Sequence, residues 1–185
     1  QKKFNVSLVD LSKEALKNAK KNIKKNLDRM IKKEIITERQ KEEIMDRISF
    51  SQKVSQCVPN SELIIEAVTE SKKIKLNIFK ELDSLCKDNA ILASNTSSIS
   101  IKDIASVTQR KDKVIGMHFM NPVPIMKLVE IIKTDETSQE TINQIIEMSL
   151  VLNKKPVLVN DAPGFVANRI LLPMINEAIH TLSEN

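Results

Sequence analysis

The sequence is poor in several features that define other classes of protein. Its 2 cysteines, Cys57 and Cys86, are too few for a disulfide framework and lack the spacing of a zinc site, so we expect no metal. No apolar run approaches the ~18 residues needed to cross a bilayer. There is no Tyr and no Trp to stack on bases. A membrane protein, a disulfide scaffold, a zinc module and a nucleic-acid-binding protein are therefore not expected.

Glycine is also scarce. The chain has 2 glycines, Gly116 and Gly164, where average usage of ~7% would give about thirteen. The first residue is Gln1 rather than Met, an apolar pattern begins at once at Phe4, and a helical pattern breaks off at Asn185. The length of 185 residues suggests about one domain on the usual scale of ~150 residues. We expect a chain cut at both ends from something longer.

Short apolar segments alternate with amphipathic ones along the chain. The short segments predict strands at 4–9, 63–68, 90–94, 114–118, 128–132 and 157–159. Three helices are predicted from their start signals: a cap at Ser12, a capping box at Thr37 and Gln40, and a capping box at Thr137 and Glu140. The second of these helices would turn Ile44, Met45 and Ile48 inward. Further helices are predicted over 74–85 and 101–107, and from Pro163 onward. Strands that alternate with helices indicate an α/β fold with a largely parallel sheet.

Positive charge is concentrated in the first part of the chain. Residues 1–50 carry 14 Lys and Arg against 8 Asp and Glu, whereas residues 51–185 carry 15 against 16. The lysines of the predicted helix after Ser12 gather on one face and are Lys17, Lys20, Lys21, Lys24, Lys25, Lys32 and Lys33. This face is either an ordinary solvated surface or a cradle for a polyanion, and a small phosphate-bearing ligand suits it better than nucleic acid.

Polar residues follow several predicted strands, at the sheet edge where open parallel sheets collect ligands. They are Asp10, Glu70, the run from Ser94 to Ser98, His118 and Asn121. Asp10 suits the ribose hydroxyls of a dinucleotide and disfavours the extra phosphate of NADP, so it favours NAD; the alternative is a helix cap.

His118 lies at a strand end and is followed by two prolines that stiffen the next turn. Glu130, on the adjoining predicted strand, is placed to hydrogen-bond one ring nitrogen and leave the other free to exchange a proton with a substrate. The alternative is a packed or surface histidine, which is our interpretation of His180 in the terminal helix.

Five segments resemble the 3-hydroxyacyl-CoA dehydrogenase family, in the family's own order. They are Ser7–Asp10, Leu63–Glu70, Ile91–Ser98, Gly116–Glu130 and Asp161–Arg169. The similarity covers nearly the whole chain, and five matched segments are far more specific than one glycine motif. Within the family, the chain is most similar to the short-chain bacterial 3-hydroxybutyryl-CoA dehydrogenases.

The resemblance implies a role for each matching residue. His118 matches the catalytic acid/base, Glu130 its charge partner, and Ser97 and Asn168 the side chains that hydrogen-bond the C3 oxygen of the substrate. On the cofactor side, Asp10 matches the ribose-binding acid, Glu70 and Lys75 match residues that line the NAD site, and Asn95 and Ser97 share a loop beside it. Lys33 matches a lysine that contacts coenzyme A, and Asn26 stands where a serine serves this contact in relatives.

The resemblance also implies an architecture and a reaction. Residues 1–160 would form a Rossmann-like NAD-binding domain without its first strand and glycine-rich turn, and residues 161–185 the first helix of an all-α substrate and dimerisation domain. The implied reaction is the reversible, NAD-dependent oxidation of an L-3-hydroxyacyl-CoA such as 3-hydroxybutanoyl-CoA, in fatty acid or butanoate metabolism. We expect a cytoplasmic homodimer or higher homo-oligomer, and we expect the 185-residue chain by itself to be inactive.

Two alternatives stay open at this point. The chain could be the dehydrogenase module of a larger multifunctional fatty-acid oxidation protein. It could also be a non-catalytic fragment that holds acyl-CoA through its lysines, which would bind coenzyme A in a salt-sensitive way and oxidise no NADH.

Overall fold

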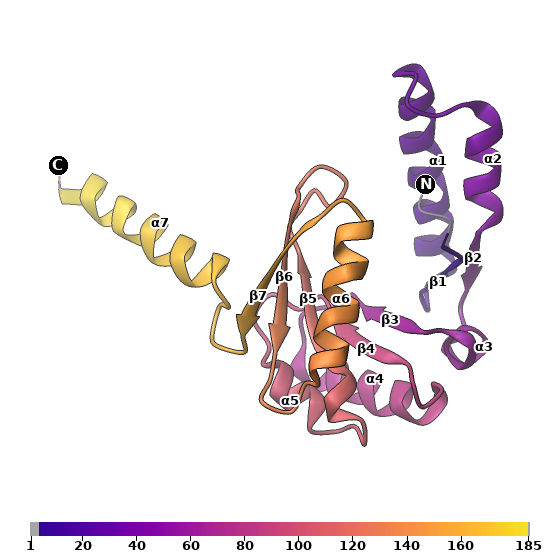
Figure 1. Cartoon of the computed structure of the whole chain (residues 1–185). Helices are drawn as coiled ribbons and strands as arrows, with labels where there is room; N and C mark the ends of the chain where they lie inside the picture. The colour runs from indigo at the N-terminus through magenta and orange to yellow at the C-terminus, as the bar shows by residue number, and fades with distance from the viewer. Residues whose placement is uncertain (1–3, 185) are drawn as a thin grey trace. The chain divides into compact units, whose positions relative to one another are not determined.

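The computed structural model describes residues 4–184 (Figure 1). Along the chain it divides into two compact units, the first ending at Asn60 and the second beginning at Ser61. In the first unit, the parallel strands β1 (Val6–Val9) and β2 (Ile48–Ser51) form a two-stranded sheet. Its helices are α1 (Lys13–Lys32), α2 (Glu38–Asp46), the short α3 (Val54–Cys57) and the 3₁₀ turn η1 (Val58–Asn60).

The two long helices of the first unit begin at the predicted caps. The Ser12 hydroxyl accepts a hydrogen bond from Ala15 N at 3.1 Å and opens α1. The Thr37–Gln40 capping box opens α2, with both of its reciprocal hydrogen bonds formed. Leu16 and Leu27 of α1 are buried, which leaves the lysines on the solvent side of the helix.

Two predictions for the first unit were wrong. Ile48 belongs to strand β2 and not to the second helix, because alternating apolar and polar residues from Ile48 to Ser51 pair with β1 in parallel register. The first strand is also shorter and less buried than predicted: it begins at Val6, whose exposed fraction is 47%. Within the described residues, β1 pairs with β2 only.

The second unit contains a five-stranded sheet in the order β3-β4-β5-β6-β7. The strands are β3 (Leu63–Glu66), β4 (Ile91–Ser94), β5 (Val114–Phe119), β6 (Leu128–Lys133) and β7 (Lys155–Asn160). The β5–β6 pair is antiparallel and the other pairs are parallel. The predicted α/β fold with a largely parallel sheet is therefore confirmed.

Helices pack on both faces of this sheet. The helix on one face is α6 (Gln139–Val151), and those on the other face are α4 (Lys72–Leu85) and α5 (Ile101–Ala105). The unit also contains the 3₁₀ turn η2 (Lys111–Lys113) and helix α7 (Ala167–Glu184), which extends away from the sheet (Figure 1). On one face, Ile142 and Ile145 of α6 join the buried side chains of β5 and β6, among them Met117 and Ile131. On the other face, Ile101 of α5 lies against β5, and α4 buries Phe79 and Leu82.

Two helix starts in the second unit differ from prediction. The cap of α6 is Ser138, whose hydroxyl accepts from Thr141 N at 3.1 Å. Thr137 is not the cap, because its hydroxyl donates to Val114 O at 3.1 Å and so ties the loop to β5. Helix α7 begins at Ala167 and not at Pro163, because Gly164 and Phe165 adopt left-handed backbone angles, with φ of +73° and 50°.

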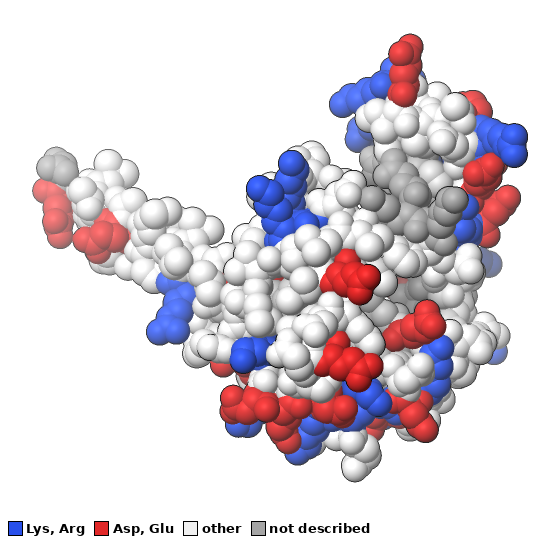
Figure 2. All heavy atoms as spheres, viewed as in Figure 1, with Lys and Arg blue, Asp and Glu red and all other residues white. Residues whose placement is uncertain are grey.

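Helix α7 has no buried residue. Its exposed apolar side chains are Ile170, Leu171, Leu172, Met174, Ile175, Ile179 and Leu182, and its surface is mostly uncharged on the side seen in Figure 2. Among residues 4–184, no helix is long and apolar enough to span a membrane.

Candidate active site

The centre of the candidate site is the pair formed by His118 on β5 and Glu130 on β6. The antiparallel register places the two residues directly opposite each other, so their side chains meet on one face of the sheet. Glu130 Oε2 lies 2.8 Å from His118 Nδ1, and the exposed fractions are 8% for His118 and 2% for Glu130. The Phe165 ring lies against the imidazole, with ring centroids 5.9 Å apart. The hydrogen bond predicted from the sequence is present.

The second oxygen of Glu130 is bonded to the start of α7. Glu130 Oε1 accepts hydrogen bonds from Val166 N at 3.0 Å and Ala167 N at 2.9 Å. The positive φ values of Gly164 and Phe165 turn the backbone so that these two N–H groups point at the carboxylate. A carboxylate at a helix N-terminus is favoured by the free N–H groups and by the helix dipole, so Glu130 is held from two sides.

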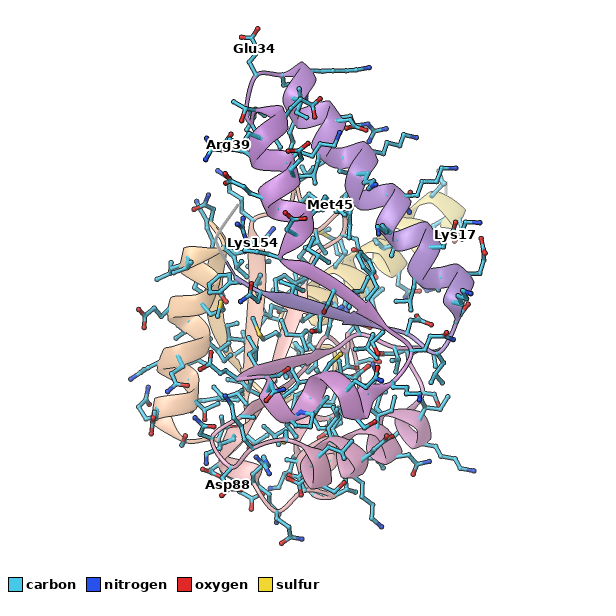
Figure 3. The ribbon with its side chains drawn as sticks, turned by 90° about the vertical axis from the view of Figure 1, so that its right-hand side faces the viewer. Lys17, Glu34, Arg39, Met45, Asp88 and Lys154 are labelled. Atoms are coloured by element: carbon cyan, nitrogen blue, oxygen red, sulfur yellow. The ribbon has the colours of Figure 1, made fainter. Side chains whose placement is uncertain are left out.

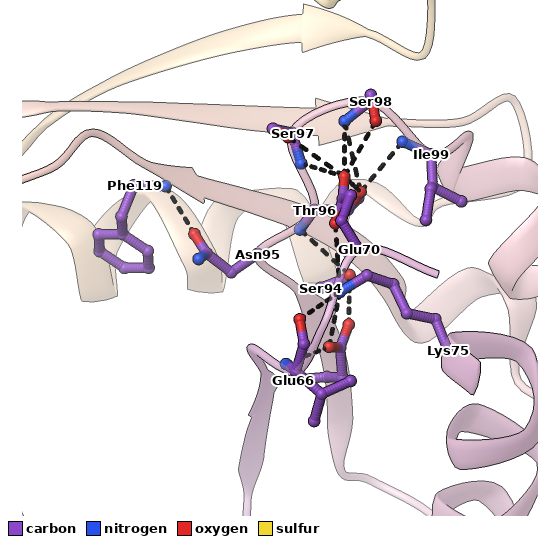
Figure 4. Close-up of polar contacts among 11 residues, drawn as sticks. Glu66, Glu70, Lys75, Ser94, Asn95, Thr96, Ser97, Ser98, Ile99 and Phe119 are labelled. Atoms are coloured by element: carbon purple, nitrogen blue, oxygen red, sulfur yellow. Dashed lines mark hydrogen bonds and ion pairs between the residues drawn. The ribbon is translucent and has the colours of Figure 1, made fainter. Parts of the chain in front are cut away.

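A second group of polar contacts surrounds Glu70 in the loop after β3 (Figure 4). Its Oε1 accepts from Thr96 Oγ1 at 2.5 Å and from the backbone N–H groups of Ser97 and Ser98 at 2.9 and 3.1 Å. Partial burial raises the pKa of Glu70, but hydrogen bonds from the Thr96 hydroxyl, Ser97 N and the Ser98 hydroxyl, with the Lys75 ammonium, outweigh burial and lower the pKa to about 2. Glu70 is therefore ionised at neutral pH and fixes the serine-rich loop after β4.

The loop after β4 also contacts α7 and β5. Asn168 Nδ2, in the first turn of α7, donates to Ser97 O at 3.3 Å. Asn95 Oδ1 accepts from Phe119 N at 2.9 Å, which joins the end of β4 to the end of β5. A continuous series of contacts therefore links the histidine pair, the start of α7 and the Ser97 loop.

Lys75 of α4 is buried behind this loop. Its ammonium lies 2.7 Å from Glu66 Oε1 and 3.5 Å from Glu70 Oε2, and its side chain is 1% exposed. Ser94 Oγ donates to the other Glu66 oxygen at 2.6 Å. Every polar atom of this cluster has a partner, which is the condition for a buried ion pair to be tolerated.

Sequence reasoning missed two residues of this region. Glu66 holds Lys75, and the signal for it was a single acid at the end of an otherwise apolar strand. Asp161 accepts from Ser100 Oγ at 2.7 Å and from Lys102 N at 2.8 Å, so it fixes the start of α5 next to the turn that leads into α7. No local pattern identifies Asp161, because its partners lie about 60 residues away.

The structure brings together the predicted residues of the second unit: His118, Glu130, Ser97, Asn168, Glu70, Lys75 and Asn95. The predicted residues Asp10, Asn26 and Lys33 lie in the first unit. Asp10 Oδ1 accepts from Ser12 N at 2.8 Å. Asn26 Oδ1 accepts from Arg29 Nη1 at 3.4 Å, and Lys33 is the exposed C-cap residue that follows α1. The ligand contacts of all ten residues stay predictions.

The fold and its polar edge define a Rossmann-type nucleotide-binding domain. The chain belongs to the 3-hydroxyacyl-CoA dehydrogenase family: residues 1–162 match the model of the 3-hydroxyacyl-CoA dehydrogenase NAD binding domain. The predicted family is confirmed.

Individual relatives, two compared by sequence and one by crystal structure, support the same family. The chain is 49% identical over 148 residues to a probable 3-hydroxybutyryl-CoA dehydrogenase of Bacillus subtilis, covering 80% of this chain and 51% of that protein. It is 54% identical over 139 residues to a 3-hydroxybutyryl-CoA dehydrogenase of Clostridioides difficile, covering 75% of this chain and 49% of that protein. The chain thus spans about half the length of these curated relatives. The crystal structure of a Ralstonia eutropha (S)-3-hydroxybutyryl-CoA dehydrogenase matches with a TM-score of 0.93 at 46% identity, over 97% of this chain and 63% of that one.

Proposed function

We propose that the protein carrying this chain is an NAD-dependent dehydrogenase that interconverts an L-3-hydroxyacyl-CoA and the corresponding 3-oxoacyl-CoA. The observation that carries the proposal is the buried contact of 2.8 Å between His118 Nδ1 and Glu130 Oε2 at the end of β5. Family membership supports the substrate class, and the printed names of the relatives favour 3-hydroxybutanoyl-CoA.

The histidine pair is arranged for proton transfer. Because Glu130 accepts the Nδ1 hydrogen of neutral His118, the lone pair of the imidazole is on Nε2. Nε2 would remove the proton from the C3 hydroxyl as hydride leaves C3. NAD, when bound, supplies the hydride acceptor. In the reverse direction, the imidazolium donates its Nε2 proton to the C3 oxygen, and Glu130 stabilises the imidazolium.

Ser97 and Asn168 are proposed to orient the C3 oxygen beside His118. The contact of 3.3 Å between Asn168 Nδ2 and Ser97 O brings these two residues together. The second amide hydrogen of Asn168 would donate to the oxygen, and so would the Ser97 hydroxyl on leaving Glu70 Oε1, to which it donates at 3.2 Å. The oxygen gains negative charge as the 3-oxo group is reduced.

The residues proposed for the cofactor fit NAD. Oδ1 of Asp10 is bonded to Ser12 N, and no described residue hydrogen-bonds Oδ2, which suits a ribose hydroxyl. Asn95 has its oxygen on Phe119 N, so its amide hydrogens are the groups it would offer to a ligand. Lys75 would act through its charge, because its side chain is 1% exposed and its ammonium is bonded to Glu66.

The remaining partners follow from the resemblance. Lys33 and the neighbouring Asn26 would contact the phosphates of coenzyme A, and the protein would act as a homodimer or higher homo-oligomer in the cytoplasm. Its place would be in fatty acid or butanoate metabolism. The alternative of a non-catalytic acyl-CoA-binding fragment draws on the same lysines.

The test is acetoacetyl-CoA-dependent oxidation of NADH by the product of the complete reading frame. His118→Gln is compared with His180→Gln, a matched variant of an exposed histidine in α7. We expect His118→Gln to lower kcat by about 10² to 10⁴, the usual contribution of general acid/base catalysis, with NADH affinity unchanged. We expect His180→Gln to behave as wild type.

Two outcomes would contradict the proposal. A His118→Gln protein that keeps most of its activity would remove His118 from the mechanism. A wild-type protein that is inactive with acetoacetyl-CoA and with longer 3-oxoacyl-CoA substrates, but that binds coenzyme A in a salt-sensitive way, would favour the binding fragment.

A further inference from the structure

The loop of residues 121–127 joins the strand that carries His118 to the strand that carries Glu130. Its turn is closed by hydrogen bonds from Ile125 N and Met126 N to Pro122 O, at 2.9 and 3.0 Å. It nevertheless turns apolar side chains to solvent, with exposed fractions of 37% for Val123, 74% for Ile125 and 41% for Met126. Clustered exposed apolar side chains beside a reactive centre are typical of a surface that a ligand covers.

Lys154, which lies between α6 and β7, holds this loop through hydrogen bonds. Its ammonium donates to Met126 O at 2.7 Å and also to Val123 O. Both acceptors are backbone carbonyls, so the lysine fixes the path of the loop whatever side chains the loop carries. Hydrogen bonds from a charged donor are about twice as strong as neutral ones.

The end of α6 determines where Lys154 lies. Asn153 takes a left-handed φ of 59°, and Lys154 N donates to Ser149 O at 2.9 Å, which closes the last turn of the helix. The next residue, Lys155, begins β7, and its N–H donates to Lys127 O at the end of the loop at 2.8 Å. The lysine is thus placed by a helix end and a strand start.

The loop begins at the same edge of the sheet as the Ser97 segment. The hydrogen bond from Phe119 N to Asn95 Oδ1 ties the residues just before the loop to the residues just before Ser97. The loop therefore begins at the sheet edge where His118 and Ser97 would hold the C3 oxygen of a substrate, a place from which its apolar side chains could contact the acyl group.

We infer that Lys154 is a positioning residue that holds the loop of residues 121–127 as an apolar wall for the acyl group of the substrate. The inference rests on the proposed dehydrogenase function. Lys154 acts through the loop carbonyls on substrate binding, and it takes no part in proton transfer by His118.

The test compares Lys154→Met, Lys154→Arg and Lys155→Met in the product of the complete reading frame. Lys155→Met is the matched control, because it removes a neighbouring lysine that is exposed and leaves the two loop carbonyls bonded. We expect Lys154→Met to raise KM for acetoacetyl-CoA about tenfold, because the loop loses both hydrogen bonds from its charged donor and part of that loss reaches substrate binding. We expect kcat, its pH profile and KM for NADH to stay within about twofold, the pattern of lost uniform binding.

The conservative variant and a measurement without turnover separate positioning from general loss of stability. Lys154→Arg keeps a charged multiple donor and should restore most of the KM. In hydrogen exchange, the amides of Ile125, Met126 and Lys127 should exchange faster in Lys154→Met than in Lys155→Met, while β5 and β6 stay protected.

The possible failures are distinguishable. A wild-type protein that does not turn over 3-oxoacyl-CoA would overturn the proposed function, and the acyl-wall role with it. An active wild type whose Lys154→Met and Lys155→Met variants share the same KM and the same loop exchange would overturn the inference on Lys154 alone. A fall in kcat with both KM values unchanged would also contradict it.

Discussion

Glu130 divides its two oxygens between the reacting imidazole and the backbone of α7. In Glu130→Gln, the amide oxygen can still accept from Val166 N and Ala167 N, which turns the NH₂ group toward His118 Nδ1. The imidazole would then carry its hydrogen on Nε2, which is the wrong tautomer for removing the hydroxyl proton. We expect a loss in kcat of about 10² or more, with little change in thermal stability.

Glu130→Ala is the comparison that separates the two tasks of this carboxylate. It removes the acceptor for both backbone N–H groups as well as for the imidazole. We expect a loss of about 1–3 kcal/mol in the free energy of unfolding, because buried donors are left unpaired, together with loss of activity. Equal unfolding free energies for the Gln and Ala variants in urea titrations would show that the α7 contact does not depend on Glu130.

Glu70 makes the stability of the loop after β4 sensitive to acid. Its folded pKa is lowered from 4.5 to about 2, so its stabilising effect is present above the unfolded pKa and is lost as pH falls from about 4.5 toward 2. The Tm difference between wild type and Glu70→Gln should therefore be largest near neutral pH and shrink across this acidic range. Because the Glu70 side chain is 38% exposed, solvent screening keeps the effect modest.

Asp135→Asn is a suitable control for the acid titration, because the Asp135 side chain is 94% exposed. Its Tm should follow that of wild type at each pH. A Glu70→Gln difference that stays constant from neutral pH to the acid limit would show that the Glu70 charge contributes nothing to folding.

At the scale of the elements, the β5–β6 pair depends on a close approach at Gly116. A Cβ at this position would lie 2.8 Å from Ile132 Cβ and 2.8 Å from Ile132 Cδ1, and 3.1 Å from Ile101 Cδ1. Both isoleucines are fully buried. Gly116→Ala should therefore destabilise the protein by about 1–3 kcal/mol or more, as overpacking of a core does.

The double variant Gly116→Ala, Ile132→Val tests the cause of this destabilisation. Valine removes the clashing Cδ1 but keeps Cβ at the site of contact, so we expect no rescue in thermal or urea unfolding. Recovery of wild-type stability in the double variant would show that the flexible end of Ile132, and not the approach of the two strands, makes Gly116 necessary.

The elements also show what sequence reasoning can reach. Apolar periodicity predicted the main strands and helices, because burial of one face determines them. The capping-box pattern assigned the α6 cap to Thr137 instead of Ser138. Both residues suit a cap, and only the tertiary contact from Thr137 to Val114 O decides between them. Sequence reasoning missed β2 because a strand of four residues becomes recognisable only when its pairing with β1 is known.

Contacts of the candidate site were predictable where two adjoining strands of the predicted sheet bring the residues together. The contact between His118 and Glu130 was predictable, because a strand-end histidine and an acid on the adjoining strand can pair across the sheet. Their roles, like those of Ser97 and Asn168, came from the family resemblance.

Glu66 was missed because no local pattern shows that a strand-end acid will pair with Lys75 of the next helix and with Ser94 of the next strand. Asp161 was missed because its partners lie about 60 residues away. The start of α7 was placed too early because left-handed backbone at Phe165 is held by the fold and is not a preference of phenylalanine.

At the scale of the whole molecule, the distribution of charge leaves one question that an experiment can decide. The first 50 residues hold 14 basic against 8 acidic side chains, whereas the remainder is nearly neutral. The lysine face of α1 is either a plain solvated surface or part of the binding site for the phosphates of coenzyme A. If the lysines bind these phosphates, replacing one particular lysine should change how strongly substrate affinity depends on ionic strength. A plain solvated surface predicts no such change.

Lys33→Gln and Lys17→Gln provide the matched pair for this question. Both lysines are exposed, but Lys33 is the C-cap that follows α1 whereas Lys17 lies near the beginning of the helix (Figure 3). If Lys33 binds a phosphate, KM for acetoacetyl-CoA should rise several-fold in Lys33→Gln at low salt. The difference from wild type should fade near 1 M salt, where the Debye length drops to ~3 Å. Lys17→Gln should match wild type throughout. Equal KM values for both variants at every salt concentration would identify the basic face as an ordinary solvated surface, and the phosphates would have to be bound elsewhere.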